Sequence, residues 1–400
     1  MIFYKESSFQ ETPIGKIPSD WTIIKLEKVL HLRNGERPKI SDGGDVPVFG
    51  ANGIMGYTNE VLVDNEFTIV VGRVGASGQV HLGKGKIWVS DNAIYSENYD
   101  NKRAHPPFLF YLLRHRKLDQ FASKTTHPII TQTFLNNFLI HLPPLEEQKR
   151  IAKILGVVDS VIAKTGEVIA KTERLKKGLM QTLLTRGIGH KEFKDTEIGR
   201  IPKDWEVVKI VDACAKVKAG GTPLTSKKEY YNGDIPFVKI EDLANAQKYL
   251  KNTLITITKA GLENSSAWLV PPKSILLAMY GSIGAMAINE IPVATNQAIL
   301  GIVPKEEKTD VEFIYYLLNF LTPHFARHAK QTTQANLTAE IVREFKIPIP
   351  PILEQRKIAE ILSTVDKKLE FEKNEKAKLE RIKLGLMDLL LTGKIRIKVN

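Results

Sequence analysis

The chain has 400 residues, of which 57 are lysine or arginine and 45 are aspartate or glutamate, so its formal net charge is +12 at pH 7. This length exceeds what one compact core usually holds, and at least two domains are expected. The positive excess favours a polyanionic partner such as nucleic acid, although a protein can also carry excess charge for solubility alone. The single cysteine, Cys214, excludes an internal disulfide framework and fits a cytoplasmic location.

Two observations argue against export or insertion into a membrane. The first nine residues include Lys5 and Glu6 and lack the apolar core of a signal peptide. The longest uncharged run, Ser274 to Asn289, is shorter than the roughly 20 residues that a membrane-spanning helix needs. We therefore expect no contact with a membrane.

The first half opens with the motif Thr-Pro-Ile-Gly-Lys-Ile-Pro-Ser-Asp-Trp at Thr12 to Trp21. From Trp21 to Leu142, short apolar runs alternate with many glycines, which predicts a strongly bent sheet with tight turns. A helix from Phe108 to Lys117, introduced by Pro106-Pro107, is expected to pack on that sheet. The predicted strands are Val46 to Phe49, Val61 to Val63, Thr68 to Val71, Gln79 to Leu82 and Lys86 to Val89.

A long helix follows this first head. Pro143-Pro144 prevents an earlier start, and Gly187 with Gly189 ends it, which leaves about 40 residues and roughly 60 Å of helix. Apolar residues recur at spacings of three and four, as in the a/d seam of a coiled coil. The strongest positions of this seam are Ile151, Ile154, Val158, Leu175 and Leu179.

The second half repeats this plan. Thr196 to Trp205 matches the opening motif and follows a short linker, Thr185 to Glu197. The second head, Trp205 to Ile349, is longer than the first and differs from it in sequence. It too reads as strands followed by a helix, here Val311 to Leu321. Strands are expected around Ile235 to Ile240, Leu254 to Ile257, Ser274 to Met279, Ala285 to Ile288 and Ala298 to Val303.

The second long helix copies the first at an offset of 207 residues, so that Pro350-Pro351 matches Pro143-Pro144 and Glu354-Gln355 matches Glu147-Gln148. Lys368, Glu372 and Glu375 occupy seam positions, which predicts a looser centre. Two similar seams in one chain most simply pack against each other as an antiparallel pair related by a pseudo-two-fold axis. The alternative is that both are ordinary long core helices. The second seam comprises Ile358, Ile361, Val365, Leu379, Ile382 and Leu386.

A search for catalytic and ligand-binding patterns finds no complete one. Gly78 to Gly85 differs from a phosphate-binding loop because its last residue is glycine where Ser or Thr holds Mg²⁺. His105-Pro106-Pro107-Phe108 is similar to the tetrapeptide of base-amino methyltransferases, but histidine stands where that motif needs Asn or Asp. No Cys/His pair has metal-ligand spacing. We therefore expect no catalytic, cofactor or metal site.

Polar and basic stretches in both heads could contact nucleic acid, since amide and guanidinium groups read bases while lysines and hydroxyls hold phosphates. For any one of these residues, an internal hydrogen bond is a simpler explanation, notably for Asn92 and Gln297. The candidates in the first head are Arg37, Lys39, Asn52, Arg73, His81, Lys84, Lys86 and Asn92. Those in the second head are Lys218, Thr222, Thr225, Lys227, Lys228, Tyr280, Asn296, Gln297, Gln331, Thr332, Thr333, Gln334 and Asn336.

Together, the repeated Ile-Gly-x-Ile-Pro-x-Asp-Trp motif and the repeated Pro-Pro-x-x-Glu-Gln helix start resemble the specificity subunit of type I restriction-modification systems. Met279 to Gly284, Thr295 to Ala298 and Gly50 to Gly53 also resemble target recognition domains of that family. The resemblance implies that each head binds one half of a bipartite, asymmetric DNA site and that the helices set the spacing. It further implies that two modification subunits dock on the chain and that restriction subunits, which translocate and cut DNA, join them. It also implies that the chain itself is not an enzyme and needs no cofactor.

The predicted architecture is therefore α+β, with two target recognition domains of mixed or antiparallel bent sheet plus helices, joined by two long helices in an antiparallel coiled coil. Its parts are residues 1–142 and 188–349 for the recognition domains, and 143–187 and 350–400 for the helices. The exposed faces of the helices and the motifs at Trp21 and Trp205 are expected to contact the modification subunits. Two rival hypotheses are a stand-alone DNA methyltransferase or nuclease, and a coiled-coil scaffold that binds only protein.

Overall fold

The computed structural model describes residues 3–38, 40–123, 128–330 and 337–398. It divides into two compact units, the first formed by Met1–Glu167 with Lys373–Asn400 and the second by Val168–Glu372. Each long helix contributes one part to each unit, and the division into recognition domains and spacer helices stays a prediction. Within the described part of the chain, no helix is both long and apolar enough to cross a membrane.

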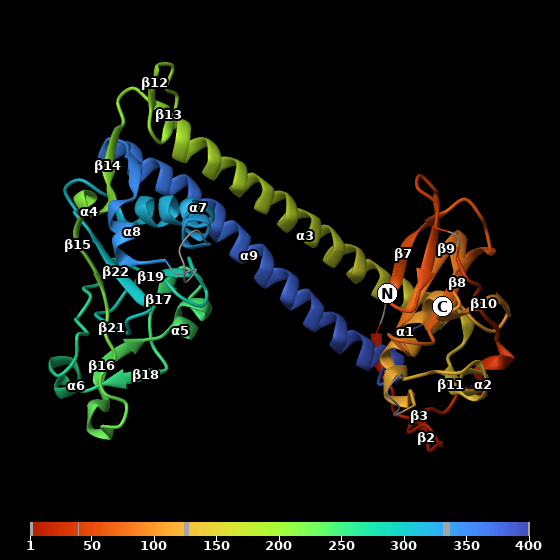
Figure 1. The fold of residues 1–400 in the computed structure, drawn as a ribbon. Coiled ribbons are helices and arrows are strands. Elements are labelled where there is room, and N and C mark those ends of the chain that lie inside the picture. Colours follow the sequence, from red (N-terminus) through yellow and green to blue (C-terminus); the bar gives the residue numbers. More distant parts are fainter. Residues whose placement is uncertain (1–2, 39, 124–127, 331–336, 399–400) are drawn as a thin grey trace. The chain divides into compact units, whose positions relative to one another are not determined.

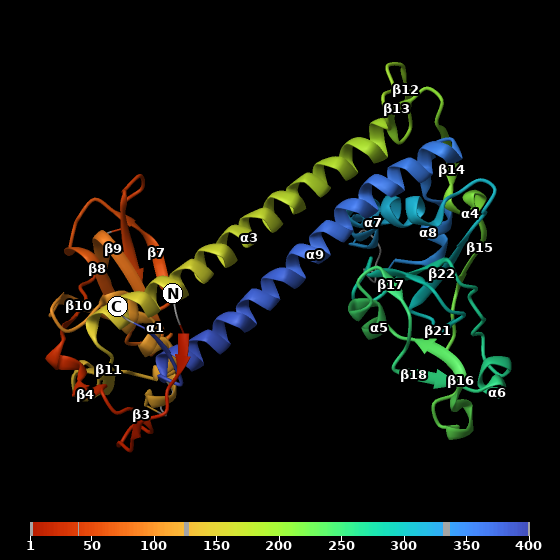
Figure 2. The same cartoon turned by 180° about the vertical axis from the view of Figure 1, so that it is seen from behind.

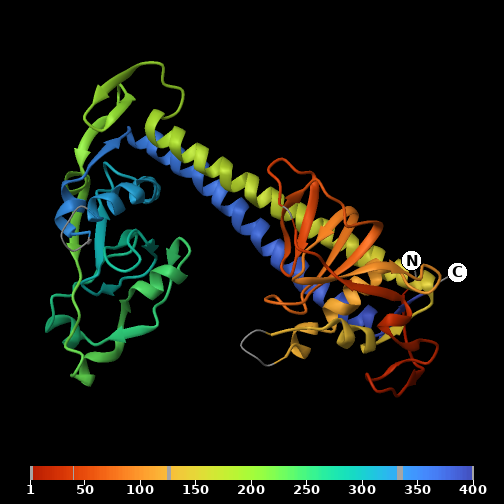
Figure 3. The ribbon, with the colours of Figure 1, turned by 45° about the vertical axis from the view of Figure 1, so that its right-hand side comes forward.

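The first unit contains a six-stranded sheet in the order β5-β10-β8-β9-β6-β7. All neighbouring strands are antiparallel except β6 and β9, which are parallel, so the sheet is mixed. Figure 1 shows α1 beside this sheet, and Figure 3 shows the sheet, drawn in orange, curving around. The strands are β5 (Leu30–Asn34), β6 (Val46–Gly50), β7 (Gly53–Thr58), β8 (Val63–Gly72), β9 (Val80–Val89) and β10 (Ala93–Tyr99).

The bend comes from register shifts inside the two longest strands. The pairing of β8 with β9 is irregular between Asn65 and Thr68. Four of the predicted strands are therefore two strands in the structure. β8 joins the runs predicted at Val61 to Val63 and Thr68 to Val71, and β9 joins those predicted at Gln79 to Leu82 and Lys86 to Val89. Such bulges increase the local twist and let a strand continue through a bend.

The core of the first unit lies between the sheet and α1 (Pro106–His115). Ile69 and Val71 on β8 pack with Phe108 and Leu112 on α1, and Ile151 of the long helix α3 (Leu145–Arg186) joins the same cluster. Proline at the start of α1 is compatible with the first helical turn, where its missing N–H would lack a partner anyway. The remaining elements here are β1 (Phe3–Lys5), β2 (Phe9–Gln10), β3 (Ile17–Pro18), β4 (Thr22–Lys25), η1 (Leu26–Lys28), η2 (Leu118–Phe121), α2 (Gln132–Asn137), β11 (Leu139–Leu142) and β24 (Ile395–Ile397).

The first and last strands pair with each other inside this unit. Phe3 of β1 faces Ile397 of β24, and Lys5 faces Ile395. The hairpin of β2 with β3 and the pair β4 with β11 complete the region around Trp21. Both ends of the chain are thus built into the first unit.

The second unit has a five-stranded sheet, β15-β22-β19-β20-β17, and a three-stranded sheet, β18-β16-β21. Both are mixed, because β17 runs parallel to β20 and β16 runs parallel to β21. The strands are β12 (Phe193–Thr196), β13 (Gly199–Pro202), β14 (Glu206–Lys209), β15 (Cys214–Ala219), β16 (Tyr231–Val238), β17 (Tyr249–Leu250), β18 (Ile255–Ile257), β19 (Ser274–Ala278), β20 (Met286–Asn289), β21 (Ala294–Thr295), β22 (Ile299–Pro304) and β23 (Lys346–Ile349).

Helices cover the larger of these sheets in the second unit. The main one is α7 (Val311–Lys330), whose Phe313, Ile314 and Leu317 are fully buried against the sheet residues Ile275 and Leu300. Figure 2 shows the smaller sheet with α5 and α6 near it. The other helices are α4 (Ile210–Ala213), η3 (Lys228–Tyr230), α5 (Ile240–Asn245), α6 (Lys259–Glu263) and α8 (Ala339–Glu344).

The two long helices begin and end near the predicted positions, α3 at Leu145–Arg186 and α9 at Ile352–Leu391. In each unit the two helical segments run in opposite directions. In the first, Asp159 pairs with Lys383, while further along α3 the amine of Lys376 lies beside Gly166. In the second, Lys176 pairs with Asp366. The α+β architecture with an antiparallel helix pair is confirmed.

The predicted seam is partly wrong. Ile151 and Ile358 are buried and most other seam residues are half-buried, but Leu175 and Ile382 are 55% and 45% exposed. Full burial occurs instead at neighbouring positions such as Leu155, Leu362 and Leu369. In each unit, the ends of the two long helices pack against the head as well as against each other. The buried face of each helix is therefore turned toward the head and the other helix, and it differs from the seam expected of two helices alone.

Candidate nucleic-acid interface

Several turns of the first unit meet at one edge of its bent sheet. The turn between β6 and β7 contains Asn52, and His81 bonds the Ala51 carbonyl in that turn through Nε2 at 3.1 Å. The backbone N–H of Arg73, after β8, donates to the Asn92 carbonyl at 2.8 Å. The N–H of Glu36, next to Arg37, donates to Val89 at the end of β9. Arg37, Asn52, Arg73 and Asn92, which lie in four turns, are thus brought into one region with His81, at the start of β9.

Glycine is required where these turns approach each other. A Cβ added at Gly72 would lie 2.7 Å from the Ala51 carbonyl oxygen, and one added at Gly35 would lie 2.2 Å from the Ser90 carbonyl oxygen. Both distances are shorter than any non-bonded contact allows. The glycine-rich composition therefore places the turn that carries Asn52 close to the turn that carries Asn92.

The side chains of this region are available for a ligand to different degrees. Asn52, Asn92 and Arg37 are exposed, and Arg73 and His81 are half-buried. Asn92 supports this region through its backbone, since its carbonyl accepts from the Arg73 N–H and its own N–H donates to Ser90 Oγ. His81 is committed to the Ala51 carbonyl, so its ring supports the turn.

Two predicted lysines of the first head lie elsewhere on β9. The amine of Lys84 sits 5.4 Å from the centre of the Phe67 ring, and Lys86 is opposite Asp64 in the β8–β9 pair. Both are exposed. The role of these two lysines as phosphate contacts stays a prediction, and they are not part of the cluster around Asn52. Lys39 lies outside the described residues.

In the second unit, two of the predicted segments are joined directly. The hydroxyl of Thr222 donates to Oε1 of Gln297 at 2.5 Å, and the N–H of Gly221 donates to the Thr295 carbonyl at 2.9 Å. Asn296 accepts the N–H of Ala298 through Oδ1, which stabilises the turn. Thr222 and Gln297 thus form an exposed hydroxyl and amide pair, whereas Asn296 has a structural role.

The other candidates of the second head are distributed around this pair. Lys218, Thr225 and Lys228 are exposed, and Lys227 donates to the Tyr230 hydroxyl and lies over its ring. Tyr280 is half-buried against the core. The candidates Gln331, Thr332, Thr333, Gln334 and Asn336 lie outside the described residues.

Exposed apolar side chains on β7 were not predicted from the sequence. The β7 strand that follows Asn52 exposes Ile54, Met55 and Tyr57, each about half accessible to solvent. Apolar and aromatic groups beside a nucleic-acid site can contact thymine methyl groups or stack on bases. The predicted strands of the first head did not include residues 54–57, so these side chains were not among the candidates.

Each head is attached to the long helices by the same three-residue contact. In the first unit the Tyr111 hydroxyl donates to Asp159 at 2.7 Å, and Lys383 pairs with that carboxylate at 2.5 Å. The pKa of Tyr111 is raised, mainly because the hydroxyl is buried and also because it is bonded to Asp159. In the second unit Tyr316, Asp366 and Lys176 repeat the arrangement with the helices exchanged. The pseudo-two-fold repeat thus extends to individual side chains.

The tryptophans of the two opening motifs are buried, and the expected contact of these motifs with modification subunits stays a prediction. Trp21 stacks on His141 at 5.2 Å, and Trp205 donates to Glu354 at 3.0 Å. His141 bonds the Leu391 carbonyl, and burial lowers its pKa to about 4, so that its ring is neutral. Large aromatic rings release most free energy when they are removed from water, which explains why both face inward, beside the ends of the long helices.

Comparison with known proteins gives the identity of the two heads. The family model described as the type I restriction modification DNA specificity domain matches residues 18–174 and again residues 202–381. The chain belongs to this family. The family's two matches fall one in each half and include both opening tryptophans and much of both long helices.

Relatives in the family align along the whole chain. The putative type I restriction enzyme MjaX specificity subunit of Methanocaldococcus jannaschii is 31% identical over 99% of this chain and 98% of its own length. The MjaVIII specificity subunit of the same organism is 30% identical over 100% of this chain and 98% of its own length. The predicted family is confirmed, and the rival hypotheses of a stand-alone enzyme or a protein-only scaffold have no support.

Solved structures share the fold. The S subunit of a type I restriction-modification system from Mycoplasma genitalium has a TM-score of 0.64 and 19% identity, over 95% of this chain and 97% of that one. A chain from a study of assembly and conformational transition of the type I system has a TM-score of 0.57 and 18% identity, over 94% and 99%. At these identities the likeness concerns the fold alone.

The described residues offer little that could catalyse a reaction. Among the described residues, no cluster of three or more His, Cys, Asp or Glu is arranged to hold a metal ion. Burial raises the pKa of the Cys214 thiol to about 12, which leaves it protonated and a poor nucleophile. The polar residues gathered at the two heads are suited to binding.

Proposed function

We propose that this chain is the DNA-reading subunit of a type I restriction-modification complex and that each head reads one half of a bipartite, asymmetric site. The observation that carries this is the pair of DNA specificity matches in one chain, set in the same repeated frame but joined to unlike heads. Unlike loops read unlike bases, so the two halves of the site differ.

In the first head, Asn52 and Asn92 are the candidates for reading bases, with Arg37 and Arg73 as phosphate or guanine contacts. In the second, Gln297 and Thr222 present the amide and hydroxyl, with Lys218 and Lys228 nearby in sequence as phosphate contacts. Asn and Gln can bond adenine with two hydrogen bonds, and Arg can bond guanine in the same way. The +12 net charge supplies general attraction to the duplex.

The long helices would set the distance between the two half-sites. A helix of 42 residues such as α3 rises about 63 Å. One turn of duplex is about 34 Å, so two readers separated by such a helix would address sequences one to two turns apart. The exposed apolar residues of the helices, among them Leu175 and Ile382, would be covered by two modification subunits, and restriction subunits would join that assembly.

In this proposal the chain performs no chemistry, and methyl transfer and cleavage belong to its partners. The decisive experiment is a map of methylated sites in a genome that encodes the complete system, compared with the same genome lacking this gene. One bipartite sequence should lose its methylation. Replacing residues 206–345 with the second head of a relative should change one half of that sequence only.

Two simpler measurements separate this function from its rivals. Purified chain incubated with DNA and a labelled methyl donor should transfer no label unless modification subunits are added. Its binding to duplex DNA should weaken steeply with salt, because phosphate contacts release counterions. Label transfer by the chain alone, or an absence of DNA binding by the chain with its modification subunits, would contradict the proposal.

A further inference from the structure

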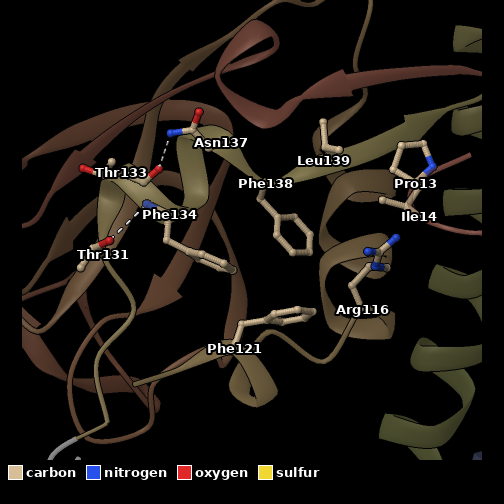
Figure 4. Close-up of a pocket in the computed structure, with 10 residues that line it drawn as sticks. All are labelled: Pro13, Ile14, Arg116, Phe121, Thr131, Thr133, Phe134, Asn137, Phe138 and Leu139. Atoms are coloured by element: carbon tan, nitrogen blue, oxygen red, sulfur yellow. Dashed lines mark hydrogen bonds between the residues drawn. The ribbon is translucent and has the colours of Figure 1, made fainter. Parts of the chain in front are cut away.

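The first unit has an open cavity that none of the candidate DNA-reading side chains lines. It measures about 500 Å³ and lies between the turn at Pro13, the end of α1, and the segment from Thr131 to Leu139. Its floor consists of three phenylalanines, Phe121, Phe134 and Phe138, whose ring centres are 5.5 to 5.8 Å apart. Figure 4 shows these rings and Arg116 directed toward the same space. A cavity of this size is within the range that binds ligand groups.

The aromatic floor is not sealed by the protein itself. Phe121 is 48% exposed, although a phenylalanine in contact with two others could be buried completely. Exposed aromatic surface that is grouped in a hollow costs solubility and usually marks a binding site. An apolar side chain of a partner would bury this surface.

A cation stands beside the apolar surface. The Arg116 guanidinium lies over the Phe138 ring at 5.3 Å and is half-buried, and burial lowers its pKa. Within the described part of the chain it has neither an ion pair nor a hydrogen bond. Lys25 is close to the rim, where it donates to Asn137 at 2.7 Å. A partly desolvated guanidinium that lacks a carboxylate partner is suited to bind one, because hydrogen bonds between arginine and a carboxylate are charge-assisted and can be bidentate.

The second unit closes the equivalent place in a different way. By the repeat offsets, Glu197 corresponds to Pro13 and Lys346 to Leu139, and these two form an ion pair at 2.5 Å. The offset that matches Tyr111 with Tyr316 places Leu321 where the first unit has Arg116. The arginine beside the apolar surface is therefore specific to the first unit and has no counterpart at the equivalent position of the second.

We infer that this cavity docks a segment of a protein partner that presents an aromatic or aliphatic side chain next to a carboxylate. The apolar side chain would rest on Phe121, Phe134 and Phe138, and the carboxylate would pair with Arg116. The exposed Thr131 and Thr133 on the rim offer hydroxyls to the main chain of such a segment. The inference concerns a site separate from DNA reading and does not depend on it.

The second unit supplies variants that should fold. Arg116→Leu introduces the residue found at 321 and removes the cation. Arg114→Asn, which introduces the residue found at 319, is the matched control, since Arg114 is exposed and lies over Phe110 on the same helix. The double change Pro13→Glu with Leu139→Lys reproduces the ion pair of Glu197 with Lys346 and should close the cavity. Thermal denaturation establishes that each variant is folded.

The test is a selection of displayed random twelve-residue peptides on the immobilised full chain, with the R116L protein used to remove peptides that bind elsewhere. Enriched peptides are expected to share an aromatic or leucine residue within two positions of Asp or Glu. The affinity of the best synthetic peptide should fall at least tenfold in R116L, stay within twofold in R114N, and be abolished by P13E/L139K if that protein folds.

Three results would overturn the inference. One is enrichment of peptides without acidic residues, and another is equal peptide affinity for wild type and R116L. The third concerns nucleic acid: if R116L weakens binding of a 30-base-pair duplex as strongly as it weakens peptide binding, the cavity belongs to the DNA interface. If the selection yields no peptide whose binding depends on Arg116, the inference is overturned in the same way as by equal affinities.

Discussion

Arg396 joins four segments of the first unit, and its removal should weaken that unit more than any exposed change. The guanidinium bonds Glu147 at 2.7 and 2.8 Å, Asp20 at 2.8 Å twice, and Glu6 at 2.6 Å. Its side chain is 5% exposed and that of Glu147 is 2% exposed. Burial disfavours the charge, but the bonds to Glu147 and Asp20 outweigh it and raise the pKa of Arg396.

The substitution Arg396→Met keeps the length of the side chain and removes its charge. Glu147 then remains as a buried carboxylate without its partner, and breaking a buried pair from one side costs about 3–5 kcal/mol. Asp20 adds little to this figure because its side chain is 54% exposed and solvent screens it. We expect a loss of about 3–5 kcal/mol in the unfolding free energy of the first unit.

Urea denaturation of the full chain measures this loss, and hydrogen exchange of the amides in β1 and β24 locates it. The double variant Arg396→Met with Glu147→Gln is the control, since it removes the stranded charge and should recover at least half of the loss. A loss below about 1 kcal/mol in the single variant would mean that Glu147 reaches water. Failure of the double variant to recover would show that packing, rather than charge, holds the four segments together.

Four further outcomes are expected. Asp159→Ala and Asp366→Ala should each lower the unfolding free energy by about 1–3 kcal/mol, because each leaves a tyrosine hydroxyl and a lysine without their acceptor. Equal denaturation curves for wild type and variants would contradict this. Below about pH 4 wild type should lose a small part of its first-unit stability that R396M lacks: Arg396 lowers the pKa of Asp20, so this stabilisation is present above the unfolded pKa and is lost as pH falls through the folded one. Arg73→Ala should reduce the slope of log affinity against log salt by about 1, measured by mobility shift, and an unchanged slope would remove Arg73 from the interface. Gln297→Ala should relax one base position in one half of the methylated site, at about 1–3 kcal/mol, and a uniform loss at both halves would contradict that role.

The sequence alone was sufficient for the arrangement of the elements. The pair Pro143-Pro144 and Gly187 located the ends of a 42-residue helix to within about two residues, because proline and glycine act on the backbone locally. The repeat at a constant offset showed that a second helix would have the same form. The existence and order of most strands followed from apolar runs between glycines, but the merging of four runs into β8 and β9 did not, because a bulge leaves no distinct local pattern.

Contacts between residues distant in sequence were decided by the tertiary structure. Periodicity assigned Leu175 and Ile382 to a seam, whereas the heads turn each helix so that other positions are buried. The burial of Trp21 and Trp205 beside the ends of the long helices could not be read from the opening motifs. The joining of Thr222 to Gln297 and the cavity beside Arg116 depend on chain segments that meet only after folding. Local chemistry fixes where a helix or strand begins and ends, while the free energy of burial, summed over the whole fold, selects which face is covered and which side chains remain available to a partner.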